Sequence, residues 1–168
     1  MIALQITDIK TFMHHLLKGT MFDNFLLQEA TITQAASFHI DGTFNKDFYS
    51  EDELEEMNLD HVPFLPFSHI RPICFELLKG KKKPGYFKFV FLLSPKNQES
   101  TIARSGSSFH NEDVSAMYLN LTYKNNILTC TTGISYRLFS LDKTLDHEWD
   151  RLVTVFFRQN GIDVEQTG

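Results

Sequence analysis

The stretch MYLNLTYKNNILTCTT, residues 117–132, decides the fold of this chain. Its first half alternates apolar and polar side chains, with Met117, Leu119 and Leu121 on one side, which is the pattern of a strand with one buried face. Asn125 and Asn126 then suit a tight turn, because asparagine tolerates left-handed backbone conformations. Residues 127–132 return with β-forming side chains, so the stretch predicts an antiparallel hairpin.

Further strands are expected on both sides of this hairpin. Residues 86–93, YFKFVFLL, are almost continuously apolar, which indicates a central strand buried on both faces. Upstream, the composition predicts an antiparallel meander. Its expected strands span residues 25–33, 36–40 and 43–49. A short strand over 1–6 is expected before the first helix, and one more at 134–139.

Two short amphipathic helices are predicted between these strands. The first covers residues 9–18, with Asp8 as N-cap and Gly19 as a left-handed C-cap. The second begins at Ser68, carries Pro72 in or near its first turn and ends at Gly80. Its predicted inward side chains are Ile70, Ile73, Cys74, Leu77 and Leu78.

Two more helices follow from cap and spacing signals. Ser50 and Glu53 form a capping-box pattern, which predicts a short acidic helix through Met57. Apolar residues recur at helical spacing from Leu141 to Phe157, which predicts a longer C-terminal helix over 141–160. The polar residues 97–113 are expected to form a mobile loop.

The order of these elements predicts an α+β fold with a mainly antiparallel sheet, two short helices and one longer C-terminal helix. A length of 168 residues fits a single domain, 1–168. Residues 9–19 align with residues 70–80 at a constant offset, which suggests two βαβββ halves. These halves would span 1–60 and 61–140, followed by the helix 141–160.

Composition excludes several classes of protein. Lysine and arginine number 16 against 21 acidic residues, so the net charge of −5 excludes a uniformly basic nucleic-acid binder but leaves room for a local basic patch. No stretch approaches the roughly 18 apolar residues of a membrane-spanning helix, and the N-terminal residues lack a secretion signal. Cys74 and Cys130 are expected to be buried free thiols. We therefore expect a cytoplasmic protein with no membrane contact.

The sequence supports no cofactor and no metal site. HExxH, GxSxG, GxGxxG and P-loop patterns are all missing from the sequence. Asp146 and Asp150 share one helical face, but we expect that face to be the solvated side opposite Trp149. No catalytic residue is assigned.

The main candidate binding surface is basic and combines the outer sides of the two short helices with the loop after the second. Its residues are Lys10, Lys18, Arg71, Lys79, Lys81, Lys82 and Lys83. Such cations neutralise phosphates without reading bases, although lysines at a helix C-terminus also interact favourably with its dipole. The acidic run 51–56 would repel phosphate unless it lies on another face.

A second candidate surface is the connector VPFLPF, residues 62–67, which either presents an apolar anchor or fills the core. The favoured hypothesis is a non-catalytic binding or scaffold domain with a protein or nucleic-acid partner. The alternative is a small enzyme with a site formed by the 97–113 loop near His69 or His110.

Several longer stretches resemble an uncharacterised family of small single-domain proteins from clostridia-type Firmicutes. They are FLLQEATIT (25–33), IDGTFNKDFYSEDELEE (40–56), RPICFELLKGKKKP (71–84), FKFVFLLSP (87–95), LTCTTG (128–133) and FSLDKTLDHEWD (139–150). This resemblance implies a bacterial cytoplasmic protein and no particular activity. In architecture alone, the two helix-plus-meander halves are similar to one domain of a DNA sliding clamp, from which the C-terminal helix departs.

Overall fold

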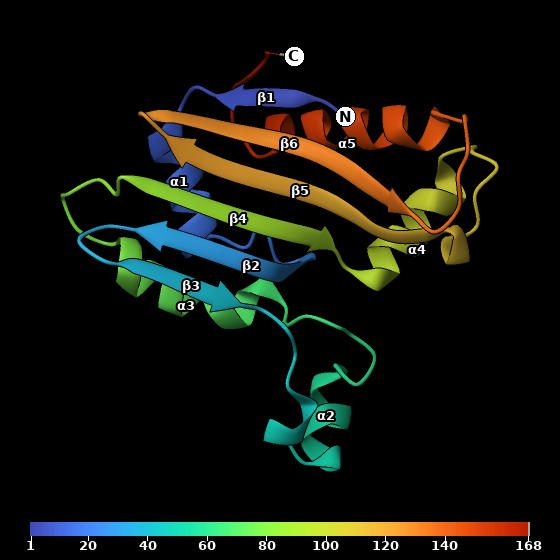
Figure 1. Cartoon of the computed structure of the whole chain (residues 1–168), viewed down its shortest axis with the longest axis horizontal. Helices are drawn as coiled ribbons and strands as arrows, with labels where there is room; N and C mark the ends of the chain where they lie inside the picture. The colour runs from blue at the N-terminus through green and yellow to red at the C-terminus, as the bar shows by residue number, and fades with distance from the viewer. Residues whose placement is uncertain (168) are drawn as a thin grey trace.

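A computed structural model describes residues 1–167, which form one seven-stranded antiparallel sheet with strand order β3-β2-β4-β5-β6-β1-β7 (Figure 1). The strands are β1 (Ala3–Ile6), β2 (Phe25–Thr33), β3 (Ser37–Asp41), β4 (Tyr86–Leu93), β5 (Val114–Lys124), β6 (Ile127–Tyr136) and β7 (Val164–Gln166). The α-helices are α1 (Ile9–Lys18), α2 (Glu51–Met57), α3 (Phe67–Leu78), α4 (Pro95–Arg104) and α5 (Thr144–Gln159). Single 3₁₀ turns span η1 (Lys46–Phe48) and η2 (Asn111–Asp113). The predicted α+β class with an antiparallel sheet is confirmed.

The hairpin that decides the fold forms as predicted, with its turn at Asn125 and Asn126. Leu121 of β5 faces Cys130 of β6, and the turn residues Asn125 and Asn126 have φ angles of 52° and 63°. Two successive positive φ angles match the right-handed twist of the flanking strands. β4 pairs with β2 on one side and β5 on the other, so it lies inside the sheet as predicted.

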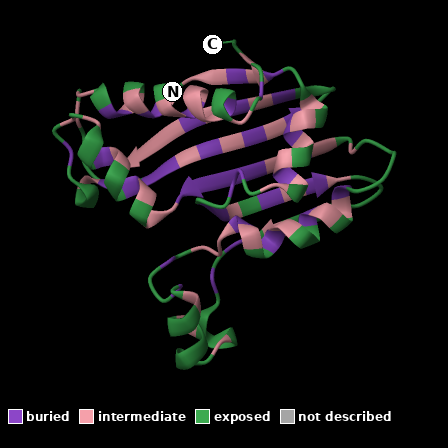
Figure 2. Ribbon diagram, turned by 180° about the vertical axis from the view of Figure 1, so that it is seen from behind, coloured by how far each residue is buried: buried purple, intermediate pink, exposed green. Residues whose placement is uncertain are grey.

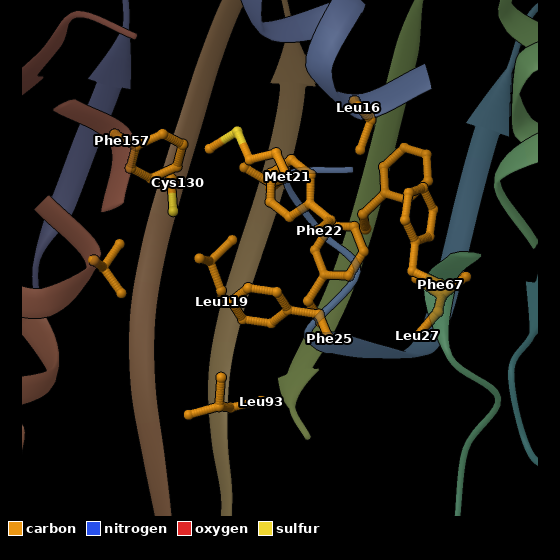
Figure 3. Packing of buried hydrophobic residues seen from close by; sticks show 14 of the residues in the cluster. Leu16, Met21, Phe22, Phe25, Leu27, Phe67, Leu93, Leu119, Cys130 and Phe157 are labelled. Atoms are coloured by element: carbon orange, nitrogen blue, oxygen red, sulfur yellow. The ribbon is translucent and has the colours of Figure 1, made fainter. Parts of the chain in front are cut away.

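Helices α1, α3 and α5 cover one face of the sheet, and the main core lies between them and the strands (Figures 1 and 2). Phe22 lies in the middle of this core (Figure 3). Its ring stacks on Phe91 of β4 with centroids 4.9 Å apart and meets Phe67 of α3 edge-on at 6.4 Å. Large aromatic side chains therefore connect the helical layer to the sheet.

The opposite face of the sheet carries a smaller apolar cluster at one end. Here the segment 43–62, which includes α2, packs on strand residues whose side chains point away from the main core. These strand residues are Leu26, Val90, Leu92 and Ala116. The rest of this face is polar, with half-buried Thr122, Thr129 and Thr131 among its side chains.

Helix α4 corrects the expectation of a loop over 97–113. Pro95 occupies the first turn, where its missing N–H costs nothing. Only Gln98 and Ile102 of this helix are buried, so its apolar pattern is too sparse to predict a helix. The structure thus adds a helix that the sequence analysis does not predict. Within residues 97–113, irregular backbone occurs only after Arg104.

Some predicted boundaries and faces are wrong. Gly19 ends α1 in an extended conformation with φ −91°, so it is not a left-handed cap. α3 begins at Phe67 after Pro66, one residue before the expected cap, and Pro72 lies inside the helix. Ile73 is 56% exposed, because the side of α3 that meets the sheet is the row Ile70, Cys74 and Leu78.

The predicted strand at 43–49 is reduced to one isolated bridge between Thr43 and Phe64, followed by a 3₁₀ turn. The expected strand at 134–139 is the end of β6, which stops at Tyr136. The C-terminal helix begins at Thr144, and Leu141 before it is 82% exposed. The duplication into two halves stays a prediction.

Candidate binding groove

A groove of about 590 Å³ lies at the end of the sheet where β4 begins and β5 ends, on the left in Figure 1. Helix α1 forms one wall, and the loop between α3 and β4 forms the other. Its lining residues are Ile9, Lys10, Met13, Leu17, Leu78, Gly80, Lys81, Lys82, Lys83, Pro84, Phe87, Tyr123 and Asn126. A volume of this size is typical of a ligand site.

The sequence of α1 fixes the first wall. Asp8 caps the helix by accepting a hydrogen bond from the backbone N–H of Thr11 at 3.0 Å. The pKa of Asp8 is lowered by a hydrogen bond from the Thr11 hydroxyl and, to a smaller extent, by this backbone hydrogen bond. Phe12 and Leu16 are fully buried and hold the helix on the sheet. The apolar residues of the lining, Ile9, Met13 and Leu17, follow one another at i, i+4 and i+8 beside that buried row.

The second wall is the lysine loop, residues 80–83. α3 ends at Leu78, and Gly80 has a φ of 116°, a conformation that side-chain-bearing residues rarely adopt. The chain turns there and presents the exposed side chains of Lys81, Lys82 and Lys83 before Pro84 leads into β4. Lys10 of α1 adds a fourth ammonium group to the rim.

The floor of the groove is apolar and rigid. The rings of Phe87 and Tyr123 stack with centroids 5.1 Å apart and are 1% and 5% exposed. The Tyr123 hydroxyl donates a hydrogen bond to Oδ1 of Asn126 at 3.1 Å. These rings support the floor, and they are too deeply covered to stack on a nucleobase.

The electrostatics of the groove are one-sided. The residues that line it include four lysines and neither an aspartate nor a glutamate. Within residues 1–167, the ion pairs found in the structure do not include any of these four lysines. The rim therefore offers four ammonium groups outside these ion pairs, of which Lys10 has a nearby carboxylate, Asp8, whose pKa its charge helps to lower.

The other predicted basic residues lie elsewhere and are engaged. Arg71 is paired with Asp23 and lies over the ring of Phe67, 5.5 Å from its centroid. Lys79 pairs with Glu76 at 2.5 Å. The ammonium of Lys18 lies 5.5 Å from the centroid of the Phe75 ring. The predicted set is thus divided, since Lys10 and Lys81 to Lys83 share the groove while the other three stabilise the helical surface.

The connector 62–67 fills the core, as one of its two interpretations predicts. Val62 and Phe67 are 4% and 0% exposed. The backbone N–H of Leu65 donates to the carbonyl of Gly42 at 2.9 Å, and the Leu65 carbonyl accepts from Leu27 at 3.0 Å. The connector thereby continues the edge of β2 beyond β3.

The region assigned to the alternative enzyme site contains a smaller hollow of about 360 Å³. Its polar side chains mainly bind backbone: Nε2 of Gln98 donates to the Val114 carbonyl at 3.2 Å, and Nη1 of Arg137 donates to the Glu112 carbonyl at 2.8 Å. Neither His69 nor His110 lines it. These contacts hold α4 and η2 against the sheet.

Asp146 and Asp150 face the sheet, which corrects the expectation that they lie on the solvated side of the C-terminal helix. The carboxylate of Asp146 accepts a 2.7 Å hydrogen bond from the hydroxyl of Tyr136, and that of Asp150 accepts one from Thr132. Both partners lie on β6 at the same i, i+4 spacing as the two aspartates. Four residues span about 6 Å along a helix but about 13 Å along a strand, so this shared spacing could not by itself have revealed the contact.

Groups of three or more histidine, cysteine, aspartate or glutamate side chains able to hold a metal ion do not occur among residues 1–167. Over the same residues, none of the helices has the length and apolar character needed to cross a membrane.

Comparison with known proteins gives one match. No curated protein and no solved structure matches the chain. The model of a family of unknown function, DUF5721, matches residues 15–165, which include the lysine loop, the last four residues of α1 and the whole sheet except β1 and the last residue of β7. The chain therefore belongs to the family of unknown function DUF5721.

Proposed function

We propose that this protein is a binding domain whose groove takes an acidic segment of a partner protein, anchored by an apolar side chain. The observation that carries the proposal is the combination of an apolar floor with a rim of four lysines that form none of the ion pairs of the described residues 1–167. A lysine side chain places its aliphatic stem along apolar surface and its ammonium in water, which suits a ligand of mixed character. Carboxylates of the ligand would pair with the rim while its apolar residue fills the floor.

An acidic peptide fits this groove better than a nucleic acid does. Proteins that bind single strands use accessible aromatic rings to stack the bases, whereas Phe87 and Tyr123 are buried here. The net charge of −5 also opposes approach of a polyphosphate chain. A short acidic segment contacts only the groove and avoids this penalty.

The test is a fluorescence-anisotropy titration with the labelled peptide Asp-Glu-Phe-Asp-Glu-Leu-Glu. We expect saturable binding that weakens steeply as salt rises from about 0.05 M to about 0.5 M. Binding should also weaken when the Phe and Leu of the peptide are replaced by Ser, since the floor then loses its anchor. Equal binding of a peptide with Gln and Asn in place of its acidic residues would refute the charge requirement.

A pair of matched variants places the binding site. Lys81→Glu with Lys82→Glu should weaken peptide binding by about tenfold or more. Lys96→Glu with Lys143→Glu makes the same change in net charge at exposed positions outside the groove. Equal loss in both variants would show that only net charge matters and would overturn the proposal.

A further inference from the structure

The segment 46–57 is a protruding arm with an unusual combination of side chains. Phe48 is 81% exposed, although an aromatic ring is normally covered. Asp47 and Glu51 flank it in sequence, and both are exposed. Figure 2 shows this part of the chain as largely exposed and set apart from the sheet.

The carboxylates of the arm are not neutralised. Asp52, Glu55 and Glu56 of α2 are exposed, and the ion pairs found among residues 1–167 do not include them or Glu51. Glu53 differs, because its carboxylate accepts the backbone N–H of Ser50 at 2.8 Å in the capping box. The arm thus offers an exposed aromatic ring beside several free negative charges.

The arm is attached to the body of the protein by apolar contacts. Tyr49 stacks on Phe44 with centroids 6.0 Å apart, and Leu54 and Met57 pack on the smaller apolar cluster. Phe48 meets only the edge of Tyr49 among the ring contacts within residues 1–167, at 5.1 Å. Because these contacts already restrict part of the arm, it loses less entropy when a partner covers it than a free segment would.

The groove of the same molecule is out of reach. The arm packs near Leu92 at the end of β4, whereas the groove floor contains Phe87 near its start. Five residues of extended strand separate these positions by about 16 Å. Because the arm is fixed to its own cluster, an arm that enters a groove must come from another molecule.

We propose that the groove of one molecule binds the arm of a second copy of this chain, with Phe48 on the apolar floor and the α2 carboxylates against Lys10 and Lys81 to Lys83. This inference rests on the proposed function and names its partner. The arm supplies what the groove lacks, an apolar anchor and negative charge, and the groove supplies the cations that the arm lacks. Such a contact joins two different surfaces and is therefore heterologous.

Sedimentation velocity of the full chain tests this contact. The wild-type protein should exceed the monomer mass as concentration rises, and about 1 M salt should return it to the monomer. Glu55→Lys with Glu56→Lys, and separately Lys81→Glu with Lys82→Glu, should each weaken self-association by about tenfold or more. Glu99→Lys with Glu165→Lys is the matched control and should associate like the wild type.

Mixing the two variants gives the sharpest readout. The Lys81→Glu/Lys82→Glu protein keeps an intact arm, and the Glu55→Lys/Glu56→Lys protein keeps an intact groove, so an equimolar mixture should form a 1:1 complex. A protein with all four substitutions should associate again, because both charges are exchanged. Phe48→Ser should weaken association without changing the charge, and circular dichroism checks that each variant is folded.

The outcomes separate the two proposals. A wild-type protein that stays monomeric at every concentration while the acidic peptide still binds would overturn self-docking and leave the groove proposal standing. Self-association that persists unchanged in the arm variant would also overturn it. If the peptide does not bind and the mixed variants still form their complex, the general acidic-peptide proposal fails and the contact between copies stands.

Discussion

The hydroxyl of Thr132, on β6, donates a hydrogen bond to the carboxylate of Asp150, on α5. The same oxygen accepts the backbone N–H of Ile2 at 2.9 Å, so one side chain connects the C-terminal helix, the sheet and the N-terminal residues. Thr132 is 1% exposed, and its hydroxyl has no water to replace these partners. The contact is buried, polar and fully satisfied.

Thr132→Val should therefore destabilise the protein by about 2 kcal/mol, since it removes the acceptor of the Ile2 N–H and the hydroxyl donor of Asp150, which keeps only its ion pair with the N-terminal ammonium of Met1 at 3.4 Å. Thr131→Val is the matched control, because Thr131 is half-buried on the opposite face of the same strand. That control should change stability by less than about 0.5 kcal/mol. Urea unfolding followed by circular dichroism measures both, and equal effects would contradict the role of this hydrogen bond.

The raised pKa of Tyr136 should make the protein less stable at alkaline pH. Burial raises the pKa of its hydroxyl well above the usual value, and the hydrogen bond to Asp146 and the nearby carboxylates raise this pKa further. The folded state therefore keeps a proton that the unfolded state loses above about pH 10, so Tyr136 stabilises the fold fully below that pH and less as pH rises. Tyr136→Phe should flatten the decline of unfolding free energy between about pH 9 and 11. An unchanged slope would exclude this tyrosine as its source.

Gly42 is required by a close backbone approach. A Cβ atom added there would lie 1.8 Å from the carbonyl oxygen of Leu27, which is backbone and cannot rotate away. Gly42→Ala should destabilise the protein by about 3 kcal/mol or lead to insoluble expression. Gly133→Ala is the control, since a Cβ there meets nothing within 4 Å. If Gly42→Ala melts at the same temperature as the wild type, the backbone at Leu27 must be able to move away from the added methyl group.

The two cysteines should be unreactive in the folded protein. Burial raises the pKa of Cys74 to about 12 and raises that of Cys130 as well, so neither is a thiolate near neutral pH. Ellman's reagent should label both only as fast as the protein unfolds, and about equally fast once urea unfolds it. Rapid labelling of one thiol without denaturant would show that its part of the core opens locally.

The elements that sequence predicted well are those with a strong local signal. The 117–132 hairpin alternates between core and solvent, the strand 86–93 is almost continuously apolar, and the acidic helix begins at the Ser50 capping box. α4 was missed because Gln98 and Ile102 are its only buried side chains. β7 is not predicted, because three residues are too few to show an alternating pattern of apolar and polar side chains. Its position depends on pairing with β1.

The candidate site was predicted in composition but not in geometry. The candidate lysines follow from charge alone, and charge does not indicate which lysines lie close together in the folded protein. Arg71 is drawn into an ion pair with Asp23, 48 positions away in sequence. The apolar floor combines α1 with Phe87 and Tyr123, and only the packing of α1 on the sheet makes these neighbours. Phe48 gave no signal, because a phenylalanine is ordinarily assigned to a core.

The most direct test of the central claim is a nuclear magnetic resonance map of the ¹⁵N-labelled protein titrated with the peptide of residues 45–58. We expect the shift changes to saturate together as peptide is added. The amides expected to shift are those of Met13, Leu17, Lys81, Lys82 and Asn126. The amide resonances of α4, and those of the polar sheet face opposite the main core, should not shift. Shifts centred on α4 or the 137–143 segment, or an unchanged spectrum, would contradict the claim that the lysine-rimmed groove is the binding site.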